Sequence, residues 1–145
     1  MRILISACLL GACCRYDGAS KPQPWIRTLA ERHTLIPVCP EQLGGLATPR
    51  PPAERRGDQV VTAAGGDVTA QYRRGAEETL RLCRLLGCEA ALLKERSPSC
   101  GSGTVYDGTF TGTLTAGDGI TAALLRAQGM PVYGESQAAE LLDPA

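Results

Sequence analysis

Residues 92–101 read Leu-Leu-Lys-Glu-Arg-Ser-Pro-Ser-Cys-Gly, and the rest of the chain is organised around this stretch. The apolar run from Glu89 to Leu93 is short and lies between Gly87 and Pro98, which predicts a buried strand and not a helix segment. Proline disfavours the helical conformation in the residue before it, so we expect the strand to end in a turn. Cys100 then follows the carboxyl end of the strand, which is the edge where open α/β sheets bind ligands.

Apolar runs with strand character alternate with helical patterns along the chain. Strands are predicted for residues 2–7, 34–38, 89–93 and 131–133. Helices are predicted for residues 25–33, 67–86, 119–128 and 137–142, with Asp67 or Thr69 capping the second and Asp118 the third. Residues 42–66 read as a loop and residues 103–117 as a small hairpin. The alternation predicts an α/β fold: a small Rossmann-like or flavodoxin-like parallel sheet of about four strands, with helices on both faces and residues 2–7 as the central strand.

Length and charge limit the class of protein. A chain of 145 residues is expected to form a single domain, residues 1–145, that buries its own core. Fifteen basic residues balance fifteen acidic ones, so strong nucleic-acid binding is not expected, although a local basic patch stays open. No apolar run is long enough to span a bilayer, and Met1 to Ser6 is too short for a secretory signal. We therefore expect a cytoplasmic protein without a membrane segment.

The chain contains seven cysteines, and their odd number and irregular spacing do not describe a disulfide framework. Cys8, Cys39 and Cys100 each follow a predicted strand, so a parallel sheet would bring them to one edge. Thiolates prefer soft metals, and three of them could hold zinc or an iron–sulfur cluster. Neither a Cys-x2-Cys pair nor a ferredoxin spacing is present, so the pattern by itself leaves metal ligation and buried or reactive thiols both open.

The roles of the remaining cysteines and of a repeated tripeptide, Tyr-Asp-Gly, can be interpreted in more than one way. Cys14 is an alternative ligand, whereas Cys83 and Cys88 lie in apolar surroundings and are expected in the core. Tyr16-Asp17-Gly18 and Tyr106-Asp107-Gly108 each lie a few residues after a strand-end cysteine. They are either two type I turns or two loops that face each other across one pocket.

Six segments resemble the thiouracil desulfurase family, and in order they cover almost the whole chain. They read Ser-Ala-Cys-Leu-Leu-Gly (6–11), Cys-Arg-Tyr-Asp-Gly (14–18), Cys-Pro-Glu-Gln-Leu-Gly-Gly-Leu (39–46), Thr-Pro-Arg-Pro-Pro-Ala-Glu (48–54), Leu-Lys-Glu-Arg-Ser-Pro-Ser-Cys-Gly (93–101) and Tyr-Asp-Gly-Thr-Phe (106–110). The resemblance implies a 4Fe-4S cluster held by Cys8, Cys39 and Cys100, whose fourth iron is open to the sulfur of the substrate. It also implies catalytic roles for Glu41 and Ser97, with Ser99 as the alternative serine.

The activity that this resemblance implies is a non-redox hydrolysis of the C–S bond of a thiouracil-type base, a small-molecule partner, to give uracil and hydrogen sulfide. Glu41 would act as a base toward water or carry a proton to the ring nitrogen, or else cap a backbone amide. Ser97 would orient substrate or water, or only stabilise its turn. Lys94 and Arg50 would polarise the base or form surface ion pairs. The alternative function is a non-catalytic metal- or cluster-binding module that carries or senses sulfur.

Overall fold

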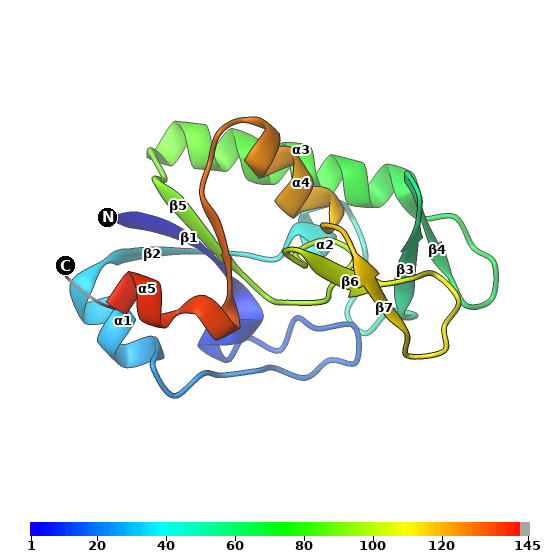
Figure 1. Cartoon of the computed structure of the whole chain (residues 1–145), viewed down its shortest axis with the longest axis horizontal. Coiled ribbons are helices and arrows are strands. Elements are labelled where there is room, and N and C mark those ends of the chain that lie inside the picture. Colours follow the sequence, from blue (N-terminus) through cyan, green and yellow to red (C-terminus); the bar gives the residue numbers. More distant parts are fainter. Residues whose placement is uncertain (143–145) are drawn as a thin grey trace.

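A parallel four-stranded sheet forms the centre of the computed structural model, which describes residues 1–142 (Figure 1). Its strands lie in the order β2 (Thr34–Val38), β1 (Arg2–Ser6), β5 (Ala90–Leu93) and β8 (Val132–Gly134). Each pair of neighbours is parallel, and Ile3 of β1 lies beside a residue of β2 on one side and of β5 on the other. The predicted α/β fold, with a small parallel sheet of four strands and residues 2–7 at its centre, is confirmed.

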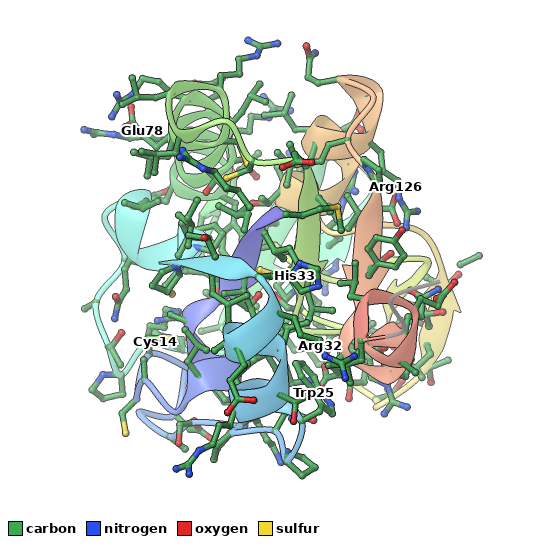
Figure 2. All side chains as sticks on the ribbon, turned by 90° about the vertical axis from the view of Figure 1, so that its left-hand side faces the viewer. Cys14, Trp25, Arg32, His33, Glu78 and Arg126 are labelled. Carbon is green, nitrogen blue, oxygen red and sulfur yellow. The ribbon has the colours of Figure 1, made fainter. Side chains whose placement is uncertain are left out.

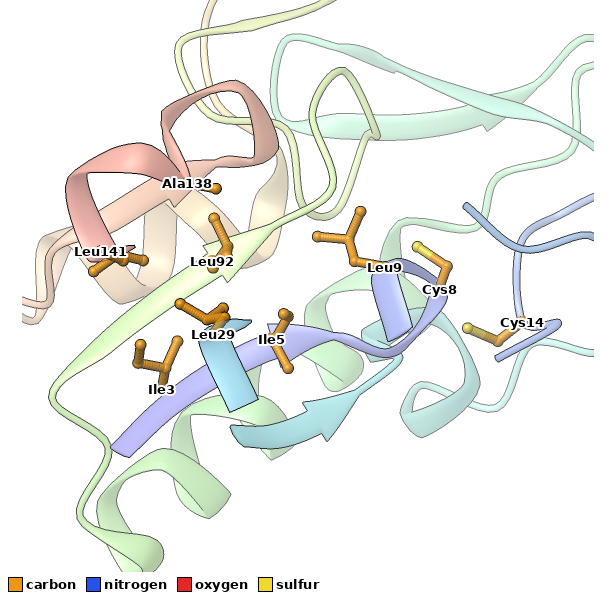
Figure 3. Packing of buried hydrophobic residues seen from close by; sticks show 9 residues of the cluster. All are labelled: Ile3, Ile5, Cys8, Leu9, Cys14, Leu29, Leu92, Ala138 and Leu141. Atoms are coloured by element: carbon orange, nitrogen blue, oxygen red, sulfur yellow. The ribbon is translucent and has the colours of Figure 1, made fainter. Parts of the chain in front are cut away.

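Two cores lie on the two faces of the sheet, because successive side chains of a strand point in opposite directions. Ile3, Ile5 and Leu92 belong to the core beneath α1 (Ile26–Arg32) and α5 (Ala139–Leu142), as Figure 3 shows. Leu4 and Leu93 belong to the core beneath α3 (Thr69–Leu86) and α4 (Ile120–Ala127). Strands buried on both faces are apolar, which explains the uninterrupted apolar runs of residues 3–5 in β1 and 90–93 in β5.

The path of the chain through the sheet creates a crevice at one edge. From β1 the chain passes to β2 on one side and later returns to β5 on the other side of β1. Connections that leave the carboxyl ends of β1 and β5 therefore diverge, and open α/β sheets bind ligands in the crevice at such a switch point. The 3-10 helix η1 (Ala7–Leu10) and helix α2 (Pro40–Leu43) begin at this edge, just after β1 and β2.

Two antiparallel hairpins lie outside the central sheet. The hairpin of β6 (Thr104–Tyr106) and β7 (Leu114–Ala116) falls within the hairpin predicted for residues 103–117. The hairpin of β3 (Ala53–Arg56) and β4 (Gln59–Thr62) corrects the prediction that residues 42–66 form a loop. The sequence of β3, Ala-Glu-Arg-Arg, has no alternation of apolar and polar residues, so periodicity could not reveal it.

The helices follow the predicted ranges closely, with corrections at their ends. Asp67 accepts the N–H of Thr69 at 2.9 Å, but the N-cap of α3 is Val68 and has no side-chain cap hydrogen bond, so the predicted cap by Asp67 or Thr69 is wrong. Asp118 does not cap α4, because its carboxylate instead pairs with Arg126 at 3.1 Å. The predicted final helix, residues 137–142, is divided into η2 (Glu135–Gln137) and α5. Among residues 1–142, none of the helices is long and apolar enough to cross a membrane.

Candidate active site

A cavity of about 500 Å³ opens at the carboxyl edge of the sheet. Cys8 in η1, Cys39 at the start of α2 and Cys100 in the loop after β5 all line it. Because these residues follow three parallel strands, the sheet brings together thiols that are far apart in the sequence. Other residues of the cavity wall are Cys14, Glu41, Arg50, Tyr72, Lys94 and Ser97.

The protein environment of the three thiols favours their neutral form. Burial raises the pKa of Cys8 to about 11 and that of Cys39 to about 12, and the nearby carboxylate of Glu41 adds to both shifts. Burial also raises the pKa of Cys100. Thiolates at such a site need cations that compensate their charge, and metal ions bound to the sulfurs supply it. The donor set therefore fits a metal centre.

The spacing of the thiols distinguishes a single ion from a cluster. Thiolates on one tetrahedral ion lie roughly 3.8 Å apart, given metal–sulfur distances of about 2.3 Å. Within residues 1–142, no three cysteine, histidine, aspartate or glutamate side chains are grouped so that they could share one ion. A cluster bonds each thiolate to a different iron and accepts wider spacing, so the lack of a single-ion group among residues 1–142 does not argue against an iron–sulfur cluster.

Glu41 and Arg50 form a buried ion pair in the wall of the cavity. Arg50 Nη2 lies 3.0 Å from Glu41 Oε2, and the two side chains are only 5% and 14% exposed, respectively. Arg50 also donates to the backbone carbonyl of Cys14 and to Oγ1 of Thr48, both at 3.0 Å. The hypothesis of a surface ion pair for Arg50 is therefore wrong, because the proline-rich segment places this side chain in the interior.

One oxygen of Glu41 has no partner within the described part of the protein. Across residues 1–142, the buried side-chain nitrogen and oxygen atoms without a hydrogen bond are Glu41 Oε1 and Arg50 Nε. An unpaired buried polar atom is unfavourable unless a ligand or water satisfies it. Glu41 is thus fixed at Oε2 and free at Oε1, and its hydrogen bond goes to Arg50 and not to a backbone amide.

The two candidate serines have different surroundings. Ser97 lines the cavity, and its Oγ accepts the backbone N–H groups of Ser99 and Cys100, both at 3.1 Å. Because the oxygen acts as acceptor in both bonds, the hydroxyl hydrogen is free to donate to a ligand. Ser99 is fully buried, and its Oγ lies 2.8 Å from Oγ1 of Thr121. This geometry favours Ser97 over the alternative Ser99 for the role that the resemblance implies.

Both Tyr-Asp-Gly turns border the cavity, through Tyr16 and Tyr106. In each turn the aspartate side chain accepts the backbone N–H two residues further on, at 2.9 Å in the first and 3.0 Å in the second. The repeat therefore marks two local turns and also two loops that share one cavity, so the two hypotheses for it are compatible.

Lys94 lines the cavity as one partner of an ion pair. Its Nζ lies 2.9 Å from Oε1 of Glu135, and the two side chains are 22% and 17% exposed. Glu135 also accepts the backbone N–H of Glu95 at 2.7 Å. The pair is partly buried, so the hypothesis of a surface ion pair for Lys94 is wrong as well.

Cys83 and His33 lie outside the cavity. Cys83 is buried in the core beneath α3, with its sulfur 3.8 Å from that of Met130. His33 lies at the end of α1, where Nε2 donates to the carbonyl of Leu141 at 2.8 Å and Nδ1 accepts from the N-terminal ammonium group at 3.0 Å (Figure 2). Neither residue lines the cavity, so neither takes part in its chemistry.

Comparison with known proteins agrees with the resemblance seen in the sequence motifs. A family model described as 2-thiouracil desulfurase matches residues 3–137. The chain belongs to the 2-thiouracil desulfurase family. A solved structure of the 4Fe-4S-dependent thiouracil desulfidase TudS is 54% identical and has a TM-score of 0.92, covering 97% of this chain and 94% of that chain. The uncharacterized protein YbbK of Bacillus subtilis (strain 168) is 43% identical over 150 residues, 97% of this chain and 99% of YbbK.

Two cavity residues of this 2-thiouracil desulfurase family member were missed or misjudged from sequence. Tyr72 reaches the cavity from α3, and burial raises its pKa above the usual range. Helical periodicity can place Tyr72 on the buried face of α3, but it cannot tell that this face ends at the cavity. Arg50 carried no sequence signal for burial, since arginine is rarely buried without a partner and the partner is known only from the fold.

Proposed function

We propose that the protein hydrolyses the C–S bond of thiolated uracil-type bases and releases the uracil base and hydrogen sulfide. Its cofactor is a 4Fe-4S cluster held by Cys8, Cys39 and Cys100, and residues 1–145 act as one domain. Family membership supports the reaction, and the 54% identical 4Fe-4S-dependent desulfidase supports the cofactor. The observation that carries the proposal is that three strand-end thiols and the half-free carboxylate of Glu41 share one cavity.

When bound, such a cluster supplies an iron without a protein ligand, a Lewis acid that suits a soft thiocarbonyl sulfur. Glu41 acts as the general base: Oε1 takes a proton from the water that attacks the ring carbon carrying the sulfur. Arg50 holds Oε2 at 3.0 Å, so the carboxylate keeps its orientation toward the cavity. The protonated carboxyl group then gives its proton to the leaving sulfur, and the added hydroxyl group loses its own proton to the sulfur as the carbonyl forms, so both protons of the water end in hydrogen sulfide. One water is consumed, and one base and one hydrogen sulfide are formed.

Ser97 orients the substrate from the loop that carries Cys100. Its oxygen accepts two backbone N–H groups, so its O–H points away from the turn and donates to an oxygen of the base. Lys94 contributes an ammonium group to the same wall, and its pair with Glu135 at 2.9 Å keeps that charge compensated. The cavity thus combines one base, one hydroxyl donor and a set of soft ligands.

The first experiment measures iron and acid-labile sulfide per chain after anaerobic reconstitution. Wild type is compared with Cys8, Cys39 and Cys100 each changed to serine, and with Cys13→Ser as a matched control, because Cys13 is exposed. We expect about four irons and four sulfides in wild type and in the control, as for a 4Fe-4S cluster, and a marked loss in the other three variants. Iron content that stays unchanged in all four variants would overturn the ligand assignment.

The second experiment measures sulfide release from thiouracil by the reconstituted protein. Wild type is expected to turn over, and Glu41→Gln to release sulfide at least about a hundredfold more slowly, because amide cannot act as the base. Iron content of Glu41→Gln is measured in parallel, so that loss of the cluster is not mistaken for loss of the base. Stoichiometric binding of the thiolated base without turnover in wild type would instead support the sulfur carrier or sensor.

A further inference from the structure

Phe110 adopts a backbone conformation that bulky residues rarely adopt. Its φ is 58°, in the left-handed region, whereas Gly108 and Gly112 in the same loop reach positive φ without a side chain to clash. A phenylalanine in this conformation persists only where its surroundings hold it, and such residues gather at functional sites. The loop therefore keeps an aromatic ring at a position where glycine would fit the backbone better.

Strand β3 holds this loop in place through two side chains. Glu54 Oε1 accepts the backbone N–H of Gly108 at 3.0 Å and that of Phe110 at 3.2 Å. Arg56 Nε donates to the carbonyl of Gly108 at 2.8 Å, and its guanidinium carbon lies 5.9 Å from the centre of the Phe110 ring. Within this range a guanidinium group attracts an aromatic face. Side chains of β3 therefore hold both the backbone and the ring of Phe110 in place before any ligand binds.

The ring fixed in this way is part of the cavity wall. Phe110 lines the same cavity as the three strand-end thiols and Glu41. A planar base offers a π-face to an aromatic ring, and stacking on a ring that is already ordered loses little conformational entropy. The cavity wall also contains Tyr16, Tyr72 and Tyr106, whose rings carry a hydroxyl group, whereas the ring of Phe110 is apolar throughout.

We propose that Phe110 is a specificity-determining residue that stacks on the pyrimidine ring of the substrate and selects planar heteroaromatic thiocarbonyl compounds over non-aromatic ones such as thiourea. The choice of a pyrimidine as ligand rests on the proposed function. The contact itself does not require the sulfur atom, so it also applies to uracil, the product.

The test is the affinity of the reconstituted protein for uracil, measured by isothermal titration under anaerobic conditions. Phe110→Leu keeps an apolar side chain without a π-face, and its affinity is expected to fall about tenfold, as for loss of one base–aromatic stack. Phe110→Tyr is expected to stay within about twofold of wild type, because the stacking face is restored. Leu114→Ala, in the same hairpin but outside the cavity wall, is the matched control and should bind uracil like wild type.

Separate readouts distinguish this inference from the proposed reaction. Iron content and the absorption spectrum of the cluster are expected to be unchanged in all three variants. The protein could bind uracil in a way that depends on Phe110 and yet release no sulfide. That result would support this inference and count against the desulfurase reaction. Unmeasurable uracil binding by wild type, unchanged affinity in Phe110→Leu, or an equal loss in Leu114→Ala would overturn the inference.

Discussion

Replacing Arg50 with methionine is expected to destabilise the protein by about 3 to 5 kcal/mol, the usual range when one partner of a buried ion pair is removed. The ion pair with Glu41 qualifies because its atoms are 3.0 Å apart and its side chains are 5% and 14% exposed. Methionine would leave the carboxylate in the interior without its cation. It would also remove the donor to the carbonyl of Cys14, which contributes about 0.5 to 1.5 kcal/mol more.

A double-mutant cycle isolates the effect of the buried charge. Glu41→Gln is neutral and nearly the same shape, so the double variant with Arg50→Met is expected to be about 2 kcal/mol more stable than the sum of the two single changes predicts. Urea unfolding of anaerobically reconstituted protein with matched iron content gives the free energy of unfolding of each variant. Arg74→Met, at an exposed arginine of α3, is the control and should change it by less than about 0.5 kcal/mol. A coupling energy below about 0.5 kcal/mol would refute the reasoning, since the two residues would then act independently.

Four other substitutions test the geometry around the cavity. A Cβ at Gly75 would lie 2.0 Å from the carbonyl oxygen of Pro40, so Gly75→Ala must displace α2. We expect this variant to lose about 1 to 3 kcal/mol of stability in thermal unfolding and to bind less iron. Unchanged stability and iron content would contradict this close packing. Ser97→Ala should keep its iron and release sulfide about a hundredfold more slowly than wild type. Ser99→Ala should mainly lose about 1 kcal/mol of stability. Equal rates of sulfide release in the two variants would argue against a catalytic role of Ser97. Cys13→Ser should retain its full iron content, and a loss would identify Cys13 as a ligand.

The central sheet could be predicted because its signals are local. Residues 2–7, 34–38 and 89–93 are short apolar runs that each end at a cysteine or a turn, and strands buried on both faces have this composition. The convergence of Cys8, Cys39 and Cys100 followed from parallel pairing alone, since the carboxyl ends of parallel strands meet at one edge. The hairpin of β3 and β4 escaped prediction because its first strand is charged and shows no alternation of apolar and polar residues.

The α/β class, the four strands of the central sheet and the three strand-end cysteines could be read from the sequence, since hydrophobic periodicity and turn residues are properties of neighbouring positions. Which polar side chains reach the cavity depends on contacts between distant segments, and these became known only from the fold. Ser97 and Ser99 are two residues apart in one turn, yet the first lines the cavity and the second bonds to Thr121 in the interior. Arg50 is held by Glu41 and the carbonyl of Cys14, and Phe110 by Glu54, and no local pattern in the sequence encodes these contacts.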